Sequence, residues 1–258
     1  MAADVHWKHR SGSEAARFLA TEAAGLEWLR VPGGPPVPSV VQLGPTRLGI
    51  ERVPEGRPTG DVAERFGARL AVVHGSGAPA FGSPPPGAPG PDGWIGDLLM
   101  PYATRDTFAE FWALDRITAT ARMARDRGGL DHAQSAEADR FVADLLGGEI
   151  DAGPPSPPAR VHGDLWSGNV LWGADAQVWV IDPAAHGGHP ESDLAMLALF
   201  GVPHLDRIIT GYELVRPLAP GWRARIPLHQ AWPLLVHAAL FGGGYGDSAI
   251  TAMRRARG

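Results

Sequence analysis

Three side chains that can hold a metal ion or move a proton stand at a spacing typical of one class of enzyme. Asn169 follows Asp164 by five positions, and Asp182 follows Asn169 by thirteen. In kinase-like phosphotransferases, an Asp accepts the proton of the attacking hydroxyl, an Asn five positions later holds Mg²⁺, and a second Asp holds Mg²⁺ from the other side. The spacing therefore predicts phosphoryl transfer with Asp164 as the catalytic base.

The elements around these residues are predicted to bring them together. Residues 159–162 are typical of a strand that enters the loop, residues 169–172 of a strand that leaves it, and residues 177–181 of a third strand after a turn. A hairpin of the last two would place Asn169 and Asp182 at one end, where a few oxygen ligands suit Mg²⁺. A polar turn explains the Gly-Asp pair alone, but not the whole pattern.

The composition fits an ordinary globular enzyme. The 258 residues are 44% hydrophobic and 20% charged, with a net charge of -5 and no basic run, so we expect no nucleic-acid partner. The absence of cysteine excludes disulfides, thiolate catalysis and Cys-ligated zinc. No stretch is apolar enough for a membrane span, and residues 1–4 begin no signal peptide, so we expect a cytoplasmic protein without a membrane partner.

Lys8 is the only lysine, and the other 22 of the 23 Lys and Arg residues are arginine. Kinase folds place a strand lysine on the ATP phosphates and pair it with a helix glutamate. Glu22 lies fourteen residues after Lys8, inside a predicted helix, and fits that role. The alternative is a chance surface lysine with a solvated glutamate, and the pair gains support only from the catalytic loop downstream.

The sequence predicts a small ATP-binding lobe over residues 1–54 and a large catalytic and substrate-binding lobe over residues 55–258. Pro and Gly at 54–58 would form the hinge, near 51–55, with Glu51 and Val53 at the adenine edge. The small lobe is expected to hold a strand over 4–8, a helix over 13–30 with Ser11 or Ser13 as N-cap, and strands over 39–43 and 47–53.

The large lobe is predicted to be mainly helical. Apolar periodicity indicates helices over 59–73, 106–127, 131–146, 191–200, 203–215 and 222–241. His74, just after the first of these, is given no chemical role. The Pro- and Gly-rich residues 75–105 show no clear element, and a segment of that length is usually functional or mobile.

The chain resembles the fructosamine kinase (ketosamine-3-kinase) family, which lies beside the aminoglycoside phosphotransferases in the protein-kinase-like superfamily. The resemblance rests on the segments 162–169, 181–184 and 191–196, and above all on the Leu-Trp-Ser-Gly that follows Gly-Asp. It implies an α+β, two-lobe fold and phosphorylation by MgATP of the sugar 3-hydroxyl of ketoamines. Asp193 resembles the acidic residue that braces the catalytic loop.

Carried over by position, the resemblance makes Asp164 the catalytic base, Asn169 and Asp182 the Mg²⁺ ligands, and Lys8 and Glu22 the phosphate-binding pair. The cofactors would be ATP and Mg²⁺. The acceptor would be a ketoamine of the fructosamine or ribulosamine type, free or on a protein lysine, as part of a repair of glycated amines. We expect a monomer.

Aromatic and imidazole side chains are candidates for the acceptor. Trp166 is expected to stack on the sugar, with Trp94 and Trp112 as weaker candidates, and His186 to contact the substrate. The spacing of His186 and His189 also suggests zinc, but no further ligand accompanies them, so zinc is disfavoured.

The sequence departs from the family in one respect. Family members carry two strands and a glycine-rich turn before the lysine strand, whereas seven residues precede Lys8 here. We therefore expect a small lobe shortened on its N-terminal side, through either a misassigned start or a true loss. Two other functions stay open, namely an aminoglycoside-type or other small-molecule phosphotransferase and a catalytically impaired ligand-binding relative.

Overall fold

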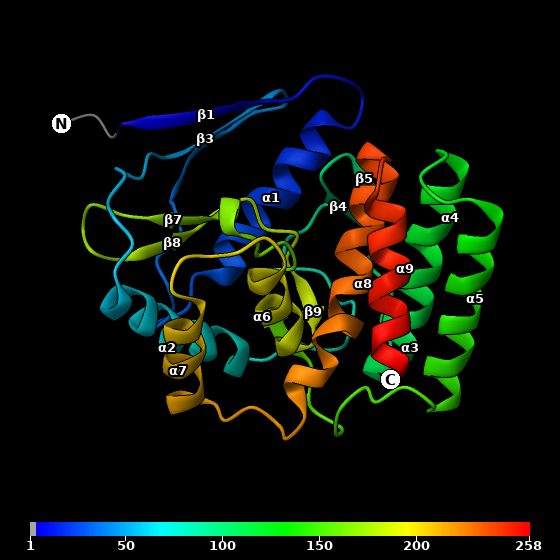
Figure 1. Ribbon diagram of the computed structural model, residues 1–258. Coiled ribbons are helices and arrows are strands. Elements are labelled where there is room, and N and C mark those ends of the chain that lie inside the picture. Colours follow the sequence, from blue (N-terminus) through cyan, green and yellow to red (C-terminus); the bar gives the residue numbers. More distant parts are fainter. Residues whose placement is uncertain (1–3) are drawn as a thin grey trace.

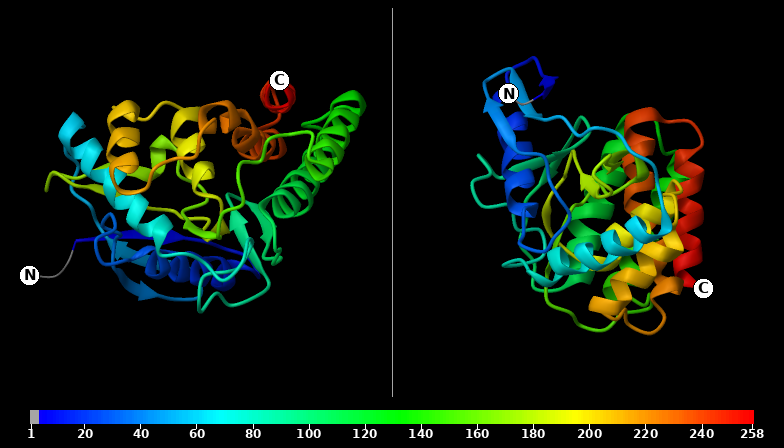
Figure 2. Two further views of the ribbon diagram at one scale, coloured as in Figure 1. Left: turned by 90° about the horizontal axis from the view of Figure 1, so that it is seen from below. Right: turned by 90° about the vertical axis from the view of Figure 1, so that its left-hand side faces the viewer.

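The computed structural model describes residues 4–258 (Figure 1). Residues 1–3, which the sequence analysis assigned to the small lobe, lie outside the described residues. A small sheet with one helix lies along one side of the molecule, and most of the helices lie on the other (Figures 1 and 2). Within residues 4–258, no helix combines the length and apolar character needed to cross a membrane.

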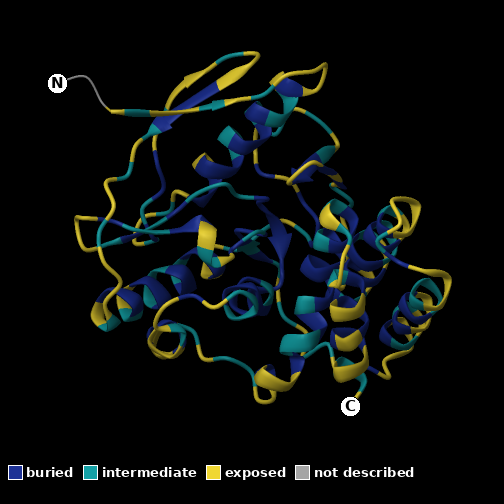
Figure 3. Ribbon diagram, turned by 45° about the horizontal axis from the view of Figure 1, so that its top comes forward, coloured by how far each residue is buried: buried dark blue, intermediate teal, exposed yellow. Residues whose placement is uncertain are grey.

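The small sheet consists of β1 (Val5–His9), β2 (Val40–Leu43) and β3 (Arg47–Glu51), in the order β1-β3-β2 with antiparallel pairing. The central strand β3 is buried, whereas β1 and β2 are largely exposed (Figure 3). Leu48 and Ile50 of β3 belong to the same hydrophobic cluster as Leu19 and Leu26 of the helix α1. The predicted strands of this region are confirmed.

Helix α1 (Ala15–Leu29) begins later than predicted, and the expected serine cap was wrong. Glu14 is the N-cap residue, and it makes no side-chain capping bond. The chain turns at Gly12, whose φ of +99° favours glycine. The Gly12 carbonyl oxygen accepts from the Ala15 amide at 3.2 Å, so the backbone itself closes the first turn.

Four short strands carry the catalytic segment. Strand β6 (Ala159–Val161) pairs with β9 (His186–Gly188), and β7 (Val170–Trp172) pairs with β8 (Val178–Val180), both antiparallel. Just beyond the second pair, the Ile181 amide donates to the Asn169 carbonyl oxygen at 3.1 Å. The predicted hairpin is therefore confirmed, and it brings residues 169 and 182 to one end.

The helices form two packed groups. Helix α2 (Gly60–Gly75), capped by Thr59, packs on α7 (Leu205–Val215). The second group surrounds α8 (Trp222–Phe241). Its apolar residues form one hydrophobic cluster with residues between Phe81 and Ile150. The remaining helices are α3 (Phe108–Glu110), the π-helix η1 (Phe111–Thr118), α4 (Ala119–Asp126), α5 (His132–Gly147), the 3₁₀ turn η2 (Ser167–Asn169), α6 (Pro190–Leu199) and α9 (Tyr245–Arg257).

The segment 75–105 was expected to lack a regular element, and this was wrong. It contains a hairpin of β4 (Asp92–Ile95) and β5 (Leu98–Pro101). Gly96, with a φ of +55°, makes its tight turn. The strands have four residues each, and the surrounding proline and glycine hid them from a pattern analysis. Trp94 and Met100 of this hairpin are buried.

Candidate active site

Lys8 joins the small sheet to the catalytic segment. Its Nζ forms ion pairs with Glu22 of α1 and with Asp182, and all three groups are at least partly buried. Burial alone lowers the pKa of Lys8, but the two carboxylates outweigh burial and raise it, so the ammonium keeps its charge. One ammonium against two carboxylates leaves an excess of negative charge, which favours a further cation beside Asp182.

Asp164 and Asn169 contact each other across the catalytic loop. The Asn169 side-chain amide donates to the Asp164 carboxylate at 3.1 Å and to its carbonyl oxygen at 2.7 Å. Burial raises the pKa of Asp164 to about 7, although the bond from Asn169 opposes this rise. A carboxylate with such a pKa is suited to take a proton near neutral pH.

Gly163 is the residue that the backbone requires at this point. Its φ is +80°, and a Cβ built there would lie 2.2 Å from the Ala184 carbonyl oxygen. A larger residue between His162 and Asp164 would therefore push the loop away from the segment that carries Asp182. The close approach explains why glycine stands in this motif.

Asp193 of α6 binds the backbone at the start of the catalytic loop. Its carboxylate accepts from the His162 amide at 2.7 Å and from the Gly163 amide at 3.0 Å. The Nε2 atom of His74 lies 3.1 Å from the same carboxylate, and the Nδ1 atom of that ring shares a hydrogen bond of 2.9 Å with the Tyr212 hydroxyl. The expected contact of Asp193 is present. The role of His74 could not be predicted from a local pattern, because both of its partners lie more than 100 positions away in the sequence.

One cavity of about 300 Å³ opens between the small sheet and the catalytic strands. Four of the six residues predicted to bind the cofactors, Lys8, Glu51, Val53 and Asp182, line this cavity. The other two, Glu22 and Asn169, line a second cavity instead. The wall of the first cavity is completed by His6, Pro38, Ile50, Arg52, Glu55, Leu171 and Ile181. Four of the lining residues, Glu51, Arg52, Val53 and Glu55, come from the segment predicted as the hinge, near residues 51–55.

A second cavity, of about 260 Å³, lies on the other side of Asp182. Asp164, Asn169 and Glu22 line it together with Trp166, which is 40% exposed. The rest of the wall comes from α1, from the β4–β5 segment and from the residues after Asp182, and consists of Phe18, Thr21, Trp94, Ile95, Gly96, Tyr102, Pro183 and Ala184. Of these, only Trp94 was a candidate from the sequence, and the hairpin that carries Ile95 and Gly96 was not predicted.

Two predicted acceptor residues are placed elsewhere. His186 is buried in β9, bonds the Ala184 carbonyl oxygen at 2.8 Å, and packs on Phe111 rather than lining the second cavity. Trp112 is also buried, and its indole nitrogen donates to the Leu228 carbonyl oxygen at 3.0 Å. Both side chains belong to the packed interior of the α8 region.

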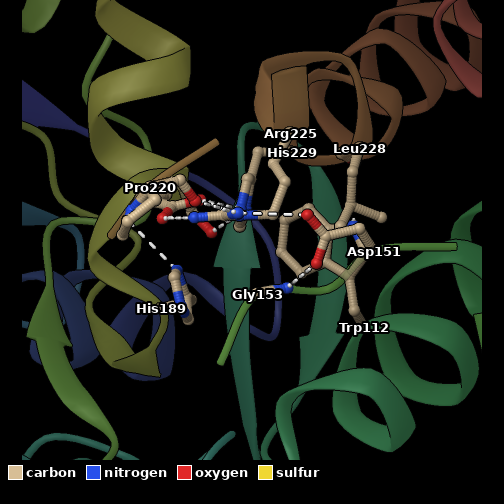
Figure 4. A network of polar contacts seen from close by, with 10 residues as sticks. Trp112, Asp151, Gly153, His189, Pro220, Arg225, Leu228 and His229 are labelled. Atoms are coloured by element: carbon tan, nitrogen blue, oxygen red, sulfur yellow. Dashed lines mark hydrogen bonds and ion pairs between the residues drawn. The ribbon is translucent and has the colours of Figure 1, made fainter. Parts of the chain in front are cut away.

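A second charged cluster lies behind the catalytic loop, where Arg225 and His229 of α8 meet α6 (Figure 4). Arg225 donates to both carboxylate oxygens of Glu191, at 2.9 and 2.6 Å, and to Asp151 at 3.1 Å. His229 lies 3.3 Å from the Glu191 carboxylate. Burial tends to raise the pKa of Glu191, but the contacts with His229 and Arg225 outweigh it and lower that pKa to about 2.

Of the two histidines whose spacing suggested zinc, His189 lies in this cluster, whereas His186 does not. His189, Glu191 and His229 point ligand atoms to within 4.8 Å of one another. The guanidinium of Arg225 already occupies both oxygens of Glu191, and its fixed charge would repel a cation. The arrangement favours a structural ion pair over zinc.

Comparison with known proteins decides the family. The model of the family described as fructosamine kinase matches residues 3–257. The chain belongs to the fructosamine kinase family. A protein of Synechocystis sp. named probable ketoamine kinase is 35% identical over 242 residues, which cover 93% of this chain and 77% of that protein.

Solved structures agree with this assignment. The crystal structure of a Thermobifida fusca protein assigned as a fructosamine-3-kinase is 46% identical, with a TM-score of 0.88, and covers 98% of this chain and 85% of that one. A macrolide 2'-phosphotransferase of Brachybacterium faecium, 14% identical with a TM-score of 0.56, covers 97% of this chain and 84% of its own, and shares the fold alone. The predicted protein-kinase-like α+β fold is confirmed.

Proposed function

We propose that the chain transfers the γ-phosphoryl group of MgATP to the 3-hydroxyl of ketosamines, as a cytoplasmic repair activity for glycated amines. Family membership makes it a phosphotransferase that acts on a sugar hydroxyl. The observation that carries the proposal is the position of Asp182, which lines both cavities and so lies where a nucleotide and an acceptor would meet.

The nucleotide would occupy the cavity between the small sheet and the catalytic strands. Residues 4–54 would then act as the ATP-binding lobe and residues 55–258 as the catalytic lobe, with the adenine at the backbone of Glu51 to Val53. Lys8, held by Glu22, would neutralise phosphate charge as a compact cation. The ion pair keeps Lys8 oriented before the nucleotide arrives.

Asn169 and Asp182 fit Mg²⁺ because they offer hard oxygen donors. The amide nitrogen of Asn169 is taken by Asp164, which leaves its side-chain oxygen for a cation. The ion would neutralise charge on the phosphate oxygens during transfer. It would also relieve the excess of negative charge around Lys8.

Asp164 would orient the sugar hydroxyl and accept its proton. Its place in the wall of the second cavity, 3.1 Å from the Asn169 amide, puts the base on the acceptor side of the metal ligands. Trp166 would give the sugar an apolar face to stack on. Its ring packs over Gly168, where a Cβ would lie 2.3 Å from the ring, and this contact fixes its position.

The competing functions make different demands on the acceptor cavity. A polycationic antibiotic needs several carboxylates, whereas the cavity combines Glu22, Asp164 and Asp182 with mostly aromatic and apolar walls, and Lys8 already pairs two of the three. An impaired relative needs no catalytic base. The observed set therefore favours a hydroxyl-rich acceptor with a single amine over a polycation.

A panel of acceptors tests the proposal. The protein is incubated with MgATP and either ribulosamine or fructosamine adducts of Nα-acetyl-lysine, with kanamycin alongside, and the products are assigned by phosphorus and proton NMR. Phosphate on the 3-hydroxyl of a ketoamine is the expected result. Transfer to kanamycin alone, or tight MgATP binding without transfer to any ketoamine, contradicts it.

A further inference from the structure

A continuous run of aromatic rings leads from the acceptor cavity to the outer surface of the large lobe. Trp166 meets Phe200 with ring centroids 6.1 Å apart, and Phe200 meets His237 at 4.9 Å. His237 in turn contacts Phe241 at 5.6 Å and Tyr245 at 5.0 Å. The run thus joins the catalytic loop to the end of α8 and the start of α9.

The run ends beside a third cavity, of about 460 Å³, between α6, α8 and α9. Phe200 and Tyr245 line this cavity, so it shares walls with the aromatic run. Its polar lining mixes amide, hydroxyl and charged groups of both signs, namely Gln230, Asp247, Ser248, Thr251 and Arg255. Such a lining suits a partner that has both backbone amides and varied side chains.

Two rings of the run, Trp166 and Phe241, are exposed. Phe241 is 68% exposed although its neighbours Ala238 and Ala239 are buried. A second contact also ties the surface to the acceptor cavity, because a Cβ at Gly96 would lie 3.0 Å from the Leu240 side chain. Exposed aromatic rings that continue from a binding cavity are typical of a surface that binds a partner.

We infer that the aromatic run of Trp166, Phe200, His237, Phe241 and Tyr245, with the adjoining cavity, binds the polypeptide that flanks a glycated lysine. The inference rests on the proposed function, since it assigns the amine half of the ketoamine to this surface. With the sugar at Asp164, the amine must leave the cavity along a wall, and Trp166 connects such a wall to the open surface. A small free amine would end before it reached Phe241.

Polypeptide is the occupant that fits this surface. A lipid surface calls for a basic face, whereas Asp247 and Arg255 put both signs of charge here. Aromatic anchors surrounded by polar groups are characteristic of sites that bind polypeptide. The three glycines at 242–244 have no atom within 4 Å of a built Cβ, so the α8–α9 turn leaves the approach open.

The experiment compares two acceptors in four forms of the protein. The acceptors are a ribulosamine of methylamine and a ribulosamine on the central lysine of a ten-residue peptide. The forms are wild type, Phe241→Ala, Tyr245→Ala and Leu214→Ala, the last being an equally exposed residue on α7, at 73% exposure, away from the surface. We expect the two aromatic variants to lose about tenfold in kcat/KM for the peptide only.

The outcomes separate this inference from the proposed function. The inference is overturned if the ratio of kcat/KM for the peptide to kcat/KM for the small ketoamine is unchanged in both aromatic variants. An equal loss of kcat/KM for both acceptors also overturns it. Neither result affects the kinase assignment. Calorimetric titration of the glycated peptide without ATP gives the same comparison if no phosphate is transferred. A wild-type dimer that Phe241→Ala converts to a monomer in sedimentation would identify the surface as a contact between copies, and would also overturn it.

Discussion

Two clusters of this protein pair a basic side chain with carboxylates, but one is open to ligands and the other is buried. Lys8, with Glu22 and Asp182, lies between two cavities, and the Asp182 side chain is 43% exposed. Arg225, with Glu191, is sealed behind the catalytic loop, with side chains only 3% and 5% exposed. The first cluster has space for ligands on both sides. In the second cluster, Arg225 directs its hydrogen bonds to other groups of the protein.

The difference shows that charge and burial alone do not identify an active site. The open cluster carries more acidic than basic groups, so it is incomplete without a ligand. The closed cluster satisfies Glu191 through the fork of Arg225, which fixes α6 against α8. Since α6 also carries Asp193, the closed cluster supports the catalytic loop without taking part in its chemistry.

The largest expected effect comes from breaking the closed cluster. Arg225→Met leaves Glu191 buried without its partner, and should lower the free energy of unfolding by about 3–5 kcal/mol. Urea denaturation measures this change. Arg122→Met, at an exposed position on α4, is the control and should have little effect. If Arg225→Met were as stable as the wild type, the closed cluster would not be structural.

The open cluster should respond in the opposite way. Lys8→Met removes a cation aimed at the nucleotide side, and should lower kcat by about 10²–10³-fold. The fold should persist, because burial raises the pKa of Glu22 and its carboxyl can take up a proton once the ammonium is gone. Lys8→Arg should restore little, because a planar fork does not replace a compact ammonium. Steady-state kinetics with varied MgATP provides the measurement, and Arg57→Met, at an exposed position that lines neither cavity, is the matched control. Activity near that of the wild type would remove Lys8 from the site.

Acid should lower the free energy of unfolding through His189 of the closed cluster, because folding lowers the pKa of this side chain. Burial and, next, His229 lower the pKa of His189 to about 3, from 6.5 in the unfolded chain. Between these values the unfolded state binds more protons, so stability falls as the pH drops. At pH 5 the loss from His189 is roughly 2 kcal/mol relative to pH 7.5.

Urea denaturation at pH 7.5 and pH 5 measures this loss. His189→Gln, which cannot take up the proton, is compared with the wild type at both values. The variant should lose roughly 2 kcal/mol less than the wild type on acidification. An identical loss in both proteins would show that protonation of His189 is not what lowers the stability on acidification.

The sequence predicted the parts of the site that are local. Asp164, Asn169 and Asp182 lie within nineteen positions, and their spacing in a strand–loop–hairpin frame determines their geometry. Lys8 and Glu22 were predicted as a pair because kinase folds pair a strand lysine with a helix glutamate, and the catalytic loop downstream supported this prediction. The ion pair between them was therefore expected, and the structure contains it.

The parts that escaped prediction depend on distant contacts or on weak patterns. Ile95 and Tyr102 reach the second cavity from a segment whose short strands lie among prolines and glycines. His186 was expected at the acceptor because it follows Asp182, but its strand turns it into the interior. His74 meets Asp193 only through the packing of the folded chain.

The most direct test of the central claim is Asp164→Asn, because the account gives Asp164 proton transfer and gives the nucleotide to the other cavity. MgATP binding by calorimetry and phosphoryl transfer to ribulosyl-lysine are measured on the same preparation. The account predicts binding close to that of the wild type and a loss of transfer of about 10²–10⁴-fold. Transfer within a few fold of the wild type would contradict it.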